Sequence, residues 1–151
     1  MFQAVASPKL RVYRRPSLAM ILVIMGAGTF SVVGQETAAD GRTLYVENCA
    51  ACHGANLEGQ PDWMNQLPSG RLPAPPHDAT GHTWHHSDAQ LLRITRDGLA
   101  AIVPGYQTDM PAFGETLVDA EIAAIIDYIK STWPERERAY QQARTDGDRN
   151  D

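Results

Sequence analysis

The segment Cys49-Ala50-Ala51-Cys52-His53 constrains this chain most, because it is a C-x-x-C-H motif that uses both cysteines of the sequence. This spacing, followed directly by histidine, is the pattern of covalent attachment of c-type haem. Thiols at positions i and i+3 lie about one helical turn apart, so each can form a thioether with one vinyl group of a haem. His53 would then supply an axial nitrogen to the iron. The motif predicts one covalently bound haem c, held by Cys49, Cys52 and His53.

Other uses of the same spacing fit the sequence less well. A zinc site needs two further nitrogen or sulfur ligands, normally from a second close pair, and the chain has no third cysteine. A thioredoxin-like pair normally lies in a βαβ context, and nothing downstream of Cys52 alternates like parallel strands. A structural disulfide could use the spacing, but a chance C-x-x-C followed by histidine is rare, on the order of one in a thousand.

The N-terminal region predicts export of the motif. Sixteen uncharged residues, Leu18 to Val33, follow the basic side chains of Lys9, Arg11, Arg14 and Arg15. As a helix this run would be about 24 Å long, against a hydrocarbon core of roughly 30 Å. Small residues at 37–39 offer a cleavage site for a signal peptidase. The apolar run is, however, slightly longer than that of most signal peptides, which favours a retained anchor.

We therefore expect residues 1–34 to be a signal peptide or an N-terminal membrane anchor, and residues 35–39 a short polar linker. In both cases the basic end stays in the cytoplasm and the rest is exported. The expected location is the bacterial periplasmic side, because c-type haem is attached outside the cytoplasm. The protein there would be membrane-anchored, or soluble if the leader is cleaved.

Charge narrows the choice of partners. The chain has 13 Lys and Arg and 18 Asp and Glu, and the first 34 residues hold 4 of the basic residues and no acid. Residues 35–151 thus carry 9 basic and 18 acidic side chains, a formal charge of −9. This sign argues against nucleic acid as a partner and for neutral or basic surfaces. The length suits one small domain with extensions.

A first helix is expected at about residues 41–51, leading into the motif. Asp40 is a good N-cap, and Leu44, Tyr45 and Asn48 fall on one face. Gly41 would permit close approach of another helix, or would simply belong to the cap region.

Two further helices are expected later in the chain. Ser87 and Gln90 form a capping box, which predicts a helix from about 88 to 96 with Gly98 as its stop. Residues 117–133 carry the clearest helical period, with Asp119 as a plausible N-cap. Its apolar stripe consists of Ile122, Ile125, Ile126 and Ile129. The mixed-charge tail, residues 135–151, lacks an apolar face and predicts a frayed extension followed by disorder.

Met110 is the expected second axial ligand. A thioether sulfur favours ferrous iron, and a Met/His pair is typical of cytochromes c. Pro111 biases Met110 toward an extended backbone in a loop expected to contain no helix. Outside the export segment only Met64 competes, and it follows His53 too closely to reach the opposite haem face easily.

With the C-x-x-C-H motif, Met110-Pro111 and the last apolar helix, residues 40–134 resemble the class I cytochromes c, small monohaem electron carriers. The resemblance implies an all-α domain of about four short helices around one haem, with His53 and Met110 as iron ligands. It also implies that the last helix crosses the first, bringing Tyr128 or Ile125 against Gly41 and Tyr45.

The resemblance assigns roles to two neighbouring segments. In the proline-rich stretch 54–81, where no long helix is expected, the carbonyl of Pro75 or Pro76 would accept a hydrogen bond from His53. Trp84 would donate its indole N–H to a haem propionate, or would only pack against the wall. Four nearby histidines are interpreted mainly as surface or pocket-edge residues: His77, His82, His85 and His86.

The expected function is single-electron transfer between respiratory-chain partners, such as an oxidase, a reductase or a quinol-oxidising complex, with no enzymatic reaction of its own. One alternative is a haem enzyme or gas sensor with a weak sixth ligand. A second alternative is a copper-handling module that uses the histidines from His77 to His86.

Overall fold

A computed structural model of the chain describes residues 33–150, with side chains from residue 41 onward. This part contains helices and no strand, which confirms the all-α fold class. The helical segments are α1 (Val33–Asn48), α2 (Ala50–His53), η1 (Thr83–His85), α3 (Asp88–Asp97), α4 (Leu99–Ile102), α5 (Asp119–Ser131) and α6 (Glu135–Asp148). No helix between residues 33 and 150 is long and apolar enough to span a membrane. The proposed signal or anchor, residues 1–34, lies almost entirely outside the described residues.

Helix α1 is longer at its N-terminal end than the sequence predicts. It begins at Val33, so it includes residues 35–39, for which a linker was expected, and Asp40 lies inside it instead of capping it. Glu, Gln and Ala are good helix formers, and no Pro interrupts this stretch, so nothing local stops the helix there. At the other end α1 stops at Asn48, and the short helix α2 carries the rest of the motif.

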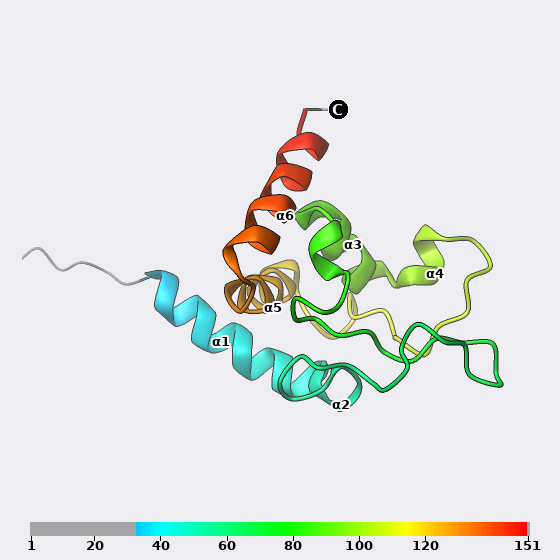
Figure 1. Ribbon diagram of the computed structural model, residues 1–151. Coiled ribbons are helices and arrows are strands. Elements are labelled where there is room, and N and C mark those ends of the chain that lie inside the picture. The colour runs from blue at the N-terminus through cyan, green and yellow to red at the C-terminus, as the bar shows by residue number, and fades with distance from the viewer. Residues whose placement is uncertain (1–32, 151) are drawn as a thin grey trace, which may run out of the picture. The chain divides into compact units, whose positions relative to one another are not determined.

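Helices α1 and α5 pack closely together, and Gly41 is the reason that they can (Figure 1). A Cβ atom at Gly41 would lie 2.1 Å from the backbone oxygen of Ala124 and 3.1 Å from Cβ of Tyr128. One turn further along α1, the rings of Tyr45 and Tyr128 lie 5.5 Å apart. The expected crossing of the first and last domain helices, with Tyr128 against Gly41 and Tyr45, is confirmed.

The core is small and is built mainly on α5. Its four isoleucines are buried as the helical period predicts, and Tyr45 and Trp133 are almost fully buried beside them. Leu57, Leu91 and Leu117 complete the cluster from the loops and α3. Helix α5 begins at Asp119, with Val118 in the cap position, and the Glu121 carboxylate accepts a hydrogen bond from Val118 N–H (2.9 Å).

Helix α3 has the boundaries that its sequence predicts. Gln90 N–H donates to Ser87 Oγ (3.2 Å) and Ser87 N–H donates to Gln90 Oε1 (3.4 Å), so the capping box is present. Gly98 ends the helix with φ of +82°, a conformation that favours glycine. Between His53 and Thr83 the proline-rich stretch forms no helix, as expected.

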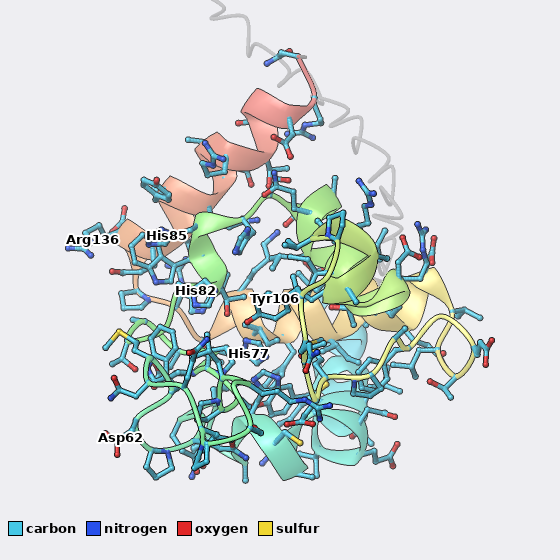
Figure 2. The ribbon with its side chains drawn as sticks, turned by 90° about the vertical axis from the view of Figure 1, so that its right-hand side faces the viewer. Asp62, His77, His82, His85, Tyr106 and Arg136 are labelled. Atoms are coloured by element: carbon cyan, nitrogen blue, oxygen red, sulfur yellow. The ribbon has the colours of Figure 1, made fainter. Side chains whose placement is uncertain are left out.

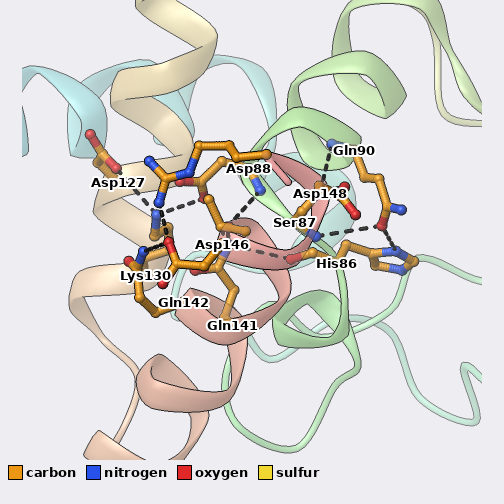
Figure 3. Close-up of polar contacts among 12 residues, drawn as sticks. His86, Ser87, Asp88, Gln90, Asp127, Lys130, Gln141, Gln142, Asp146 and Asp148 are labelled. Atoms are coloured by element: carbon orange, nitrogen blue, oxygen red, sulfur yellow. Dashed lines mark hydrogen bonds and ion pairs between the residues drawn. The ribbon is translucent and has the colours of Figure 1, made fainter. Parts of the chain in front are cut away.

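The polar tail differs from its predicted state, because residues 135–148 form an ordered helix, α6, that packs on η1 and α3 (Figure 3). Helix α6 has no apolar face, so it docks through buried polar side chains instead. Gln141, 1% exposed, donates to Asp88 Oδ1 (2.7 Å), and Thr145 Oγ1 accepts from Asp88 N–H (3.1 Å). Lys130 from α5 also donates to Asp88 (2.6 Å), so one carboxylate joins α3, α5 and α6.

Candidate haem-binding site

The C-x-x-C-H motif forms a single tight turn at the end of α1. Cys49 N–H donates to the carbonyl of Tyr45 (2.8 Å), and His53 N–H donates to the carbonyl of Cys49 (2.9 Å). Cys49 is half-buried and Cys52 is exposed, and the two thiols are not joined in a disulfide. Both sulfur atoms are therefore free to form thioether bonds.

The ring of His53 is buried and oriented by one hydrogen bond. Its Nδ1 lies 2.8 Å from the carbonyl oxygen of Pro75, which can only accept, so Nδ1 carries the proton and donates. Of the two prolines that the sequence suggested, Pro75 is the acceptor. This tautomer leaves the lone pair of Nε2 available for a metal. Burial lowers the pKa of His53, an effect that the Pro75 bond partly opposes, and the neutral ring is the form that binds iron.

Two glycines hold the Pro75-Pro76 segment against the motif. A Cβ atom at Gly59 would lie 2.4 Å from the nitrogen of Pro76, and one at Gly81 would lie 2.0 Å from its oxygen. Gly59 N–H also donates to the carbonyl of His53 (2.8 Å). Close backbone packing on both sides therefore fixes the carbonyl that orients His53.

The ring of His77 lies directly against His53, the proposed proximal ligand. The sequence did not predict this contact. Its ring stacks on that of His53 with centroids 4.0 Å apart, and its Nδ1 lies 2.8 Å from Thr83 Oγ1. Its carbonyl accepts a hydrogen bond from Trp133 Nε1 (2.7 Å). Burial lowers the pKa of His77 well below its ordinary value. The buried, neutral ring thus acts as a packing residue that supports His53.

The other histidines do not converge on a metal site. Figure 2 shows His77 and His82 on the segment that leads into η1, and His85 in η1 itself. His82 stacks on Trp63 (5.4 Å), and His85 packs against Trp84 (3.8 Å). In the part of the chain that the structure describes, no three His, Cys, Asp or Glu side chains are placed to hold a metal ion.

Met110 lies in the loop between α4 and α5, half-buried. The stretch 99–113 was expected to contain no helix, but its first residues form the single turn of α4 (Leu99–Ile102). After Met110 it is joined to α3, because Phe113 N–H donates to Thr95 (3.0 Å) and Gly114 N–H donates to Arg96 (2.9 Å). The axial role of Met110 stays a prediction.

The indole N–H of Trp84 is buried and has no hydrogen-bond partner among the described residues. Tyr140 packs edge-on against its ring (5.3 Å), and Arg136 lies over the ring (5.9 Å). A buried N–H without an acceptor costs about 1–3 kcal/mol, so such a group normally has a partner. A haem propionate would be a suitable acceptor. Two free thiols, a neutral imidazole with a free nitrogen and this unpaired donor all fit a covalently bound haem.

Comparison with known proteins agrees with this geometry. Residues 38–133 match the cytochrome c family. That match covers more than half of the chain, so the chain belongs to the cytochrome c family, whose members carry covalently attached haem. It is a c-type cytochrome, and helix α6 lies beyond the matched residues.

Curated relatives are similar over the same region. The chain is 34% identical over 90 residues to the cbb3-type cytochrome c oxidase subunit CcoP of Azospirillum brasilense, covering 59% of this chain and 26% of that protein. It is 30% identical over 94 residues to the corresponding subunit FixP of Azorhizobium caulinodans, covering 62% and 28%. The chain thus spans about a quarter of the length of these relatives. No solved structure matches the chain significantly.

Proposed function

We propose that this chain carries single electrons between respiratory-chain partners through one haem c. Cys49 and Cys52 would hold the haem by thioether bonds, and His53 and Met110 would be the axial ligands of its iron. The observation that carries the proposal is the His53 ring, buried, neutral and oriented by Pro75, directly after the two unbridged cysteines in the motif. This is the arrangement that a proximal haem ligand requires.

The residues around the site favour electron transfer over an enzymatic reaction. When bound, the haem supplies reversible one-electron exchange between ferric and ferrous iron. Ligands from both faces would leave no open coordination position for a substrate or for oxygen. The stacked His77 and the glycine-packed Pro75 carbonyl hold His53 in one orientation. Little rearrangement would then accompany a change of charge at the iron.

An oxidase is the partner that the relatives suggest. Both are described as subunits of cbb3-type cytochrome c oxidases. We infer that this domain delivers electrons to such an oxidase or receives them from its donor, on the periplasmic side of a bacterial membrane. The basic and apolar N-terminal sequence supports export, with the leader either retained as an anchor or cleaved.

The variant Met110→Ala tests the ligand set. We expect it to lose the far-red methionine-to-iron absorption band and to show a reduction potential lower by about a hundred millivolts or more, because axial ligation sets much of the potential. Optical spectroscopy and a redox titration of the haem-loaded protein measure both. Met64→Ala is the matched control, because Met64 is 74% exposed and should leave both values unchanged.

Two results would contradict the proposal. An unchanged spectrum in Met110→Ala would remove Met110 from the ligand set. Binding of carbon monoxide to the reduced, natively folded wild-type protein would show an open or weakly closed sixth position, as a haem enzyme or gas sensor has.

A further inference from the structure

The two ends of the loop that carries Met110 are held very differently. Its C-terminal side is joined to α3 by the backbone hydrogen bonds of Phe113 and Gly114. On the N-terminal side, residues 104–109, the hydrogen bonds among the described residues are local, with one exception. That exception is the ion pair between Asp109 and the guanidinium of Arg71, which lies 38 positions earlier in the chain. Asp109 directly precedes Met110.

Arg71 comes from a segment that is itself well ordered, residues 60–74, here called the insertion loop. Its base is closed by two hydrogen bonds, from Gln60 N–H to the Ala74 carbonyl (2.9 Å) and from Ala74 N–H to Gln60 Oε1 (3.1 Å). Its tip is a turn in which Leu67 N–H donates to the Arg71 carbonyl (2.9 Å). These hydrogen bonds therefore hold the backbone of Arg71 in a defined position.

The insertion loop and the Met110 loop lie side by side, on the right-hand side of Figure 1. A hollow of about 310 Å³, open to solvent, lies between them, lined by Gln66, Ser69, Gly70 and Leu72 on one side and by Gly105, Tyr106 and Gln107 on the other. The Arg71–Asp109 pair is thus a direct polar link between the two segments.

We propose that Arg71 is a positioning residue, which acts through Asp109 to keep the Met110 loop closed over the haem iron. The inference rests on the proposed axial role of Met110. Loss of the pair would leave the N-terminal half of the loop without its link to the insertion loop. The population of open loops, in which Met110 is off the iron, would then increase.

The expected effect is modest, because the side chains of Arg71 and Asp109 are 40% and 62% exposed. Exposed ion pairs are weak, so removing this pair should increase the open population about two- to fivefold. An external ligand that binds only the open form reports this population directly, because its apparent affinity scales with the competent fraction. Imidazole added to the ferric, haem-loaded protein is such a probe.

The experiment compares the imidazole affinities of Arg71→Gln, Asp109→Asn and the double variant with that of the wild type. Each single variant should bind imidazole about two- to fivefold more tightly, and the double variant no more tightly than either, since all three lack the same pair. Salt should raise the wild-type affinity and leave that of Arg71→Gln nearly unchanged. Arg149→Gln is the matched control, because it breaks another exposed ion pair, with Asp146 on α6, and should have no effect.

The outcomes separate this inference from the proposed function. Wild-type affinity in both single variants, or additive effects in the double variant, would overturn the positioning role of Arg71. If Met110→Ala binds imidazole no more tightly than the wild type, the axial assignment of Met110 fails instead. A change in Arg71→Gln with a matching change in Arg149→Gln would show a general charge effect and would also overturn the inference.

Discussion

At the scale of single residues, backbone contacts decide the positions of the side chains in this site. His53 donates to a carbonyl that two glycines hold in place, and Tyr45 Oη donates to the carbonyl of Gly54 (2.8 Å) at the end of the motif. The sequence identifies the motif but not these supports, because a glycine required for close approach looks the same in a sequence as one in an open turn. Gly41 and Gly147, both in helices, illustrate the difference.

Gly41→Ala should destabilise the protein by about 1–3 kcal/mol or more. The new methyl group would meet the backbone of Ala124, which cannot move aside as a side chain can. Gly147→Ala, where nothing lies within 4 Å, should be neutral or stabilise α6 by up to about 1 kcal/mol. Denaturant unfolding of the two haem-loaded variants measures both changes. Equal stabilities would show that α1 and α5 are not in close contact at Gly41.

At the scale of helices, α6 shows that a helix without an apolar face can still dock specifically. Gln141 and Thr145 face Asp88, and Ser87 Oγ hydrogen-bonds to Asp148, so the first turn of α3 is covered by polar groups of α6. Tyr140 of the same helix packs against Trp84. The periodicity of apolar residues could not predict this contact, because its partners are polar and more than fifty residues apart in sequence.

Gln141→Ala should lower the free energy of unfolding by about 1–3 kcal/mol, because it removes a hydrogen bond to the Asp88 carboxylate and leaves a void where the buried Gln141 side chain packs. Its neighbour provides the control. Gln142 is exposed and bonds only to Asp146 (3.0 Å), so Gln142→Ala should change the stability by no more than about 0.5 kcal/mol. Thermal unfolding followed by circular dichroism would distinguish them, and equal effects would mean that α6 is not docked.

At the scale of the whole molecule, net charge would influence encounters with the proposed redox partners. Residues 35–151 carry a formal charge of −9, so this part of the chain repels anions and attracts cations at long range. Such a field increases association rates with basic partners and is screened over about 8 Å at physiological salt.

Small redox reagents test this field without a protein partner. Oxidation of the reduced protein by anionic ferricyanide should become faster as salt is added, whereas electron exchange with cationic hexaammineruthenium should become slower. Stopped-flow kinetics at several ionic strengths give both slopes. The opposite signs would mean that a local positive surface around the haem outweighs the net charge.

The sequence by itself determined the cofactor chemistry, the all-α class and the helices α3 and α5. The all-α class follows from the resemblance to the class I cytochromes c. The rest follows from local patterns, namely the C-x-x-C-H spacing, the Ser87–Gln90 capping box and the isoleucine period. Only the tertiary structure decided that Pro75 orients His53, that His77 supports it, that α6 is ordered and that Arg71 meets Asp109. These features join residues distant in sequence through backbone carbonyls and polar side chains, which leave no periodic signal in a single sequence.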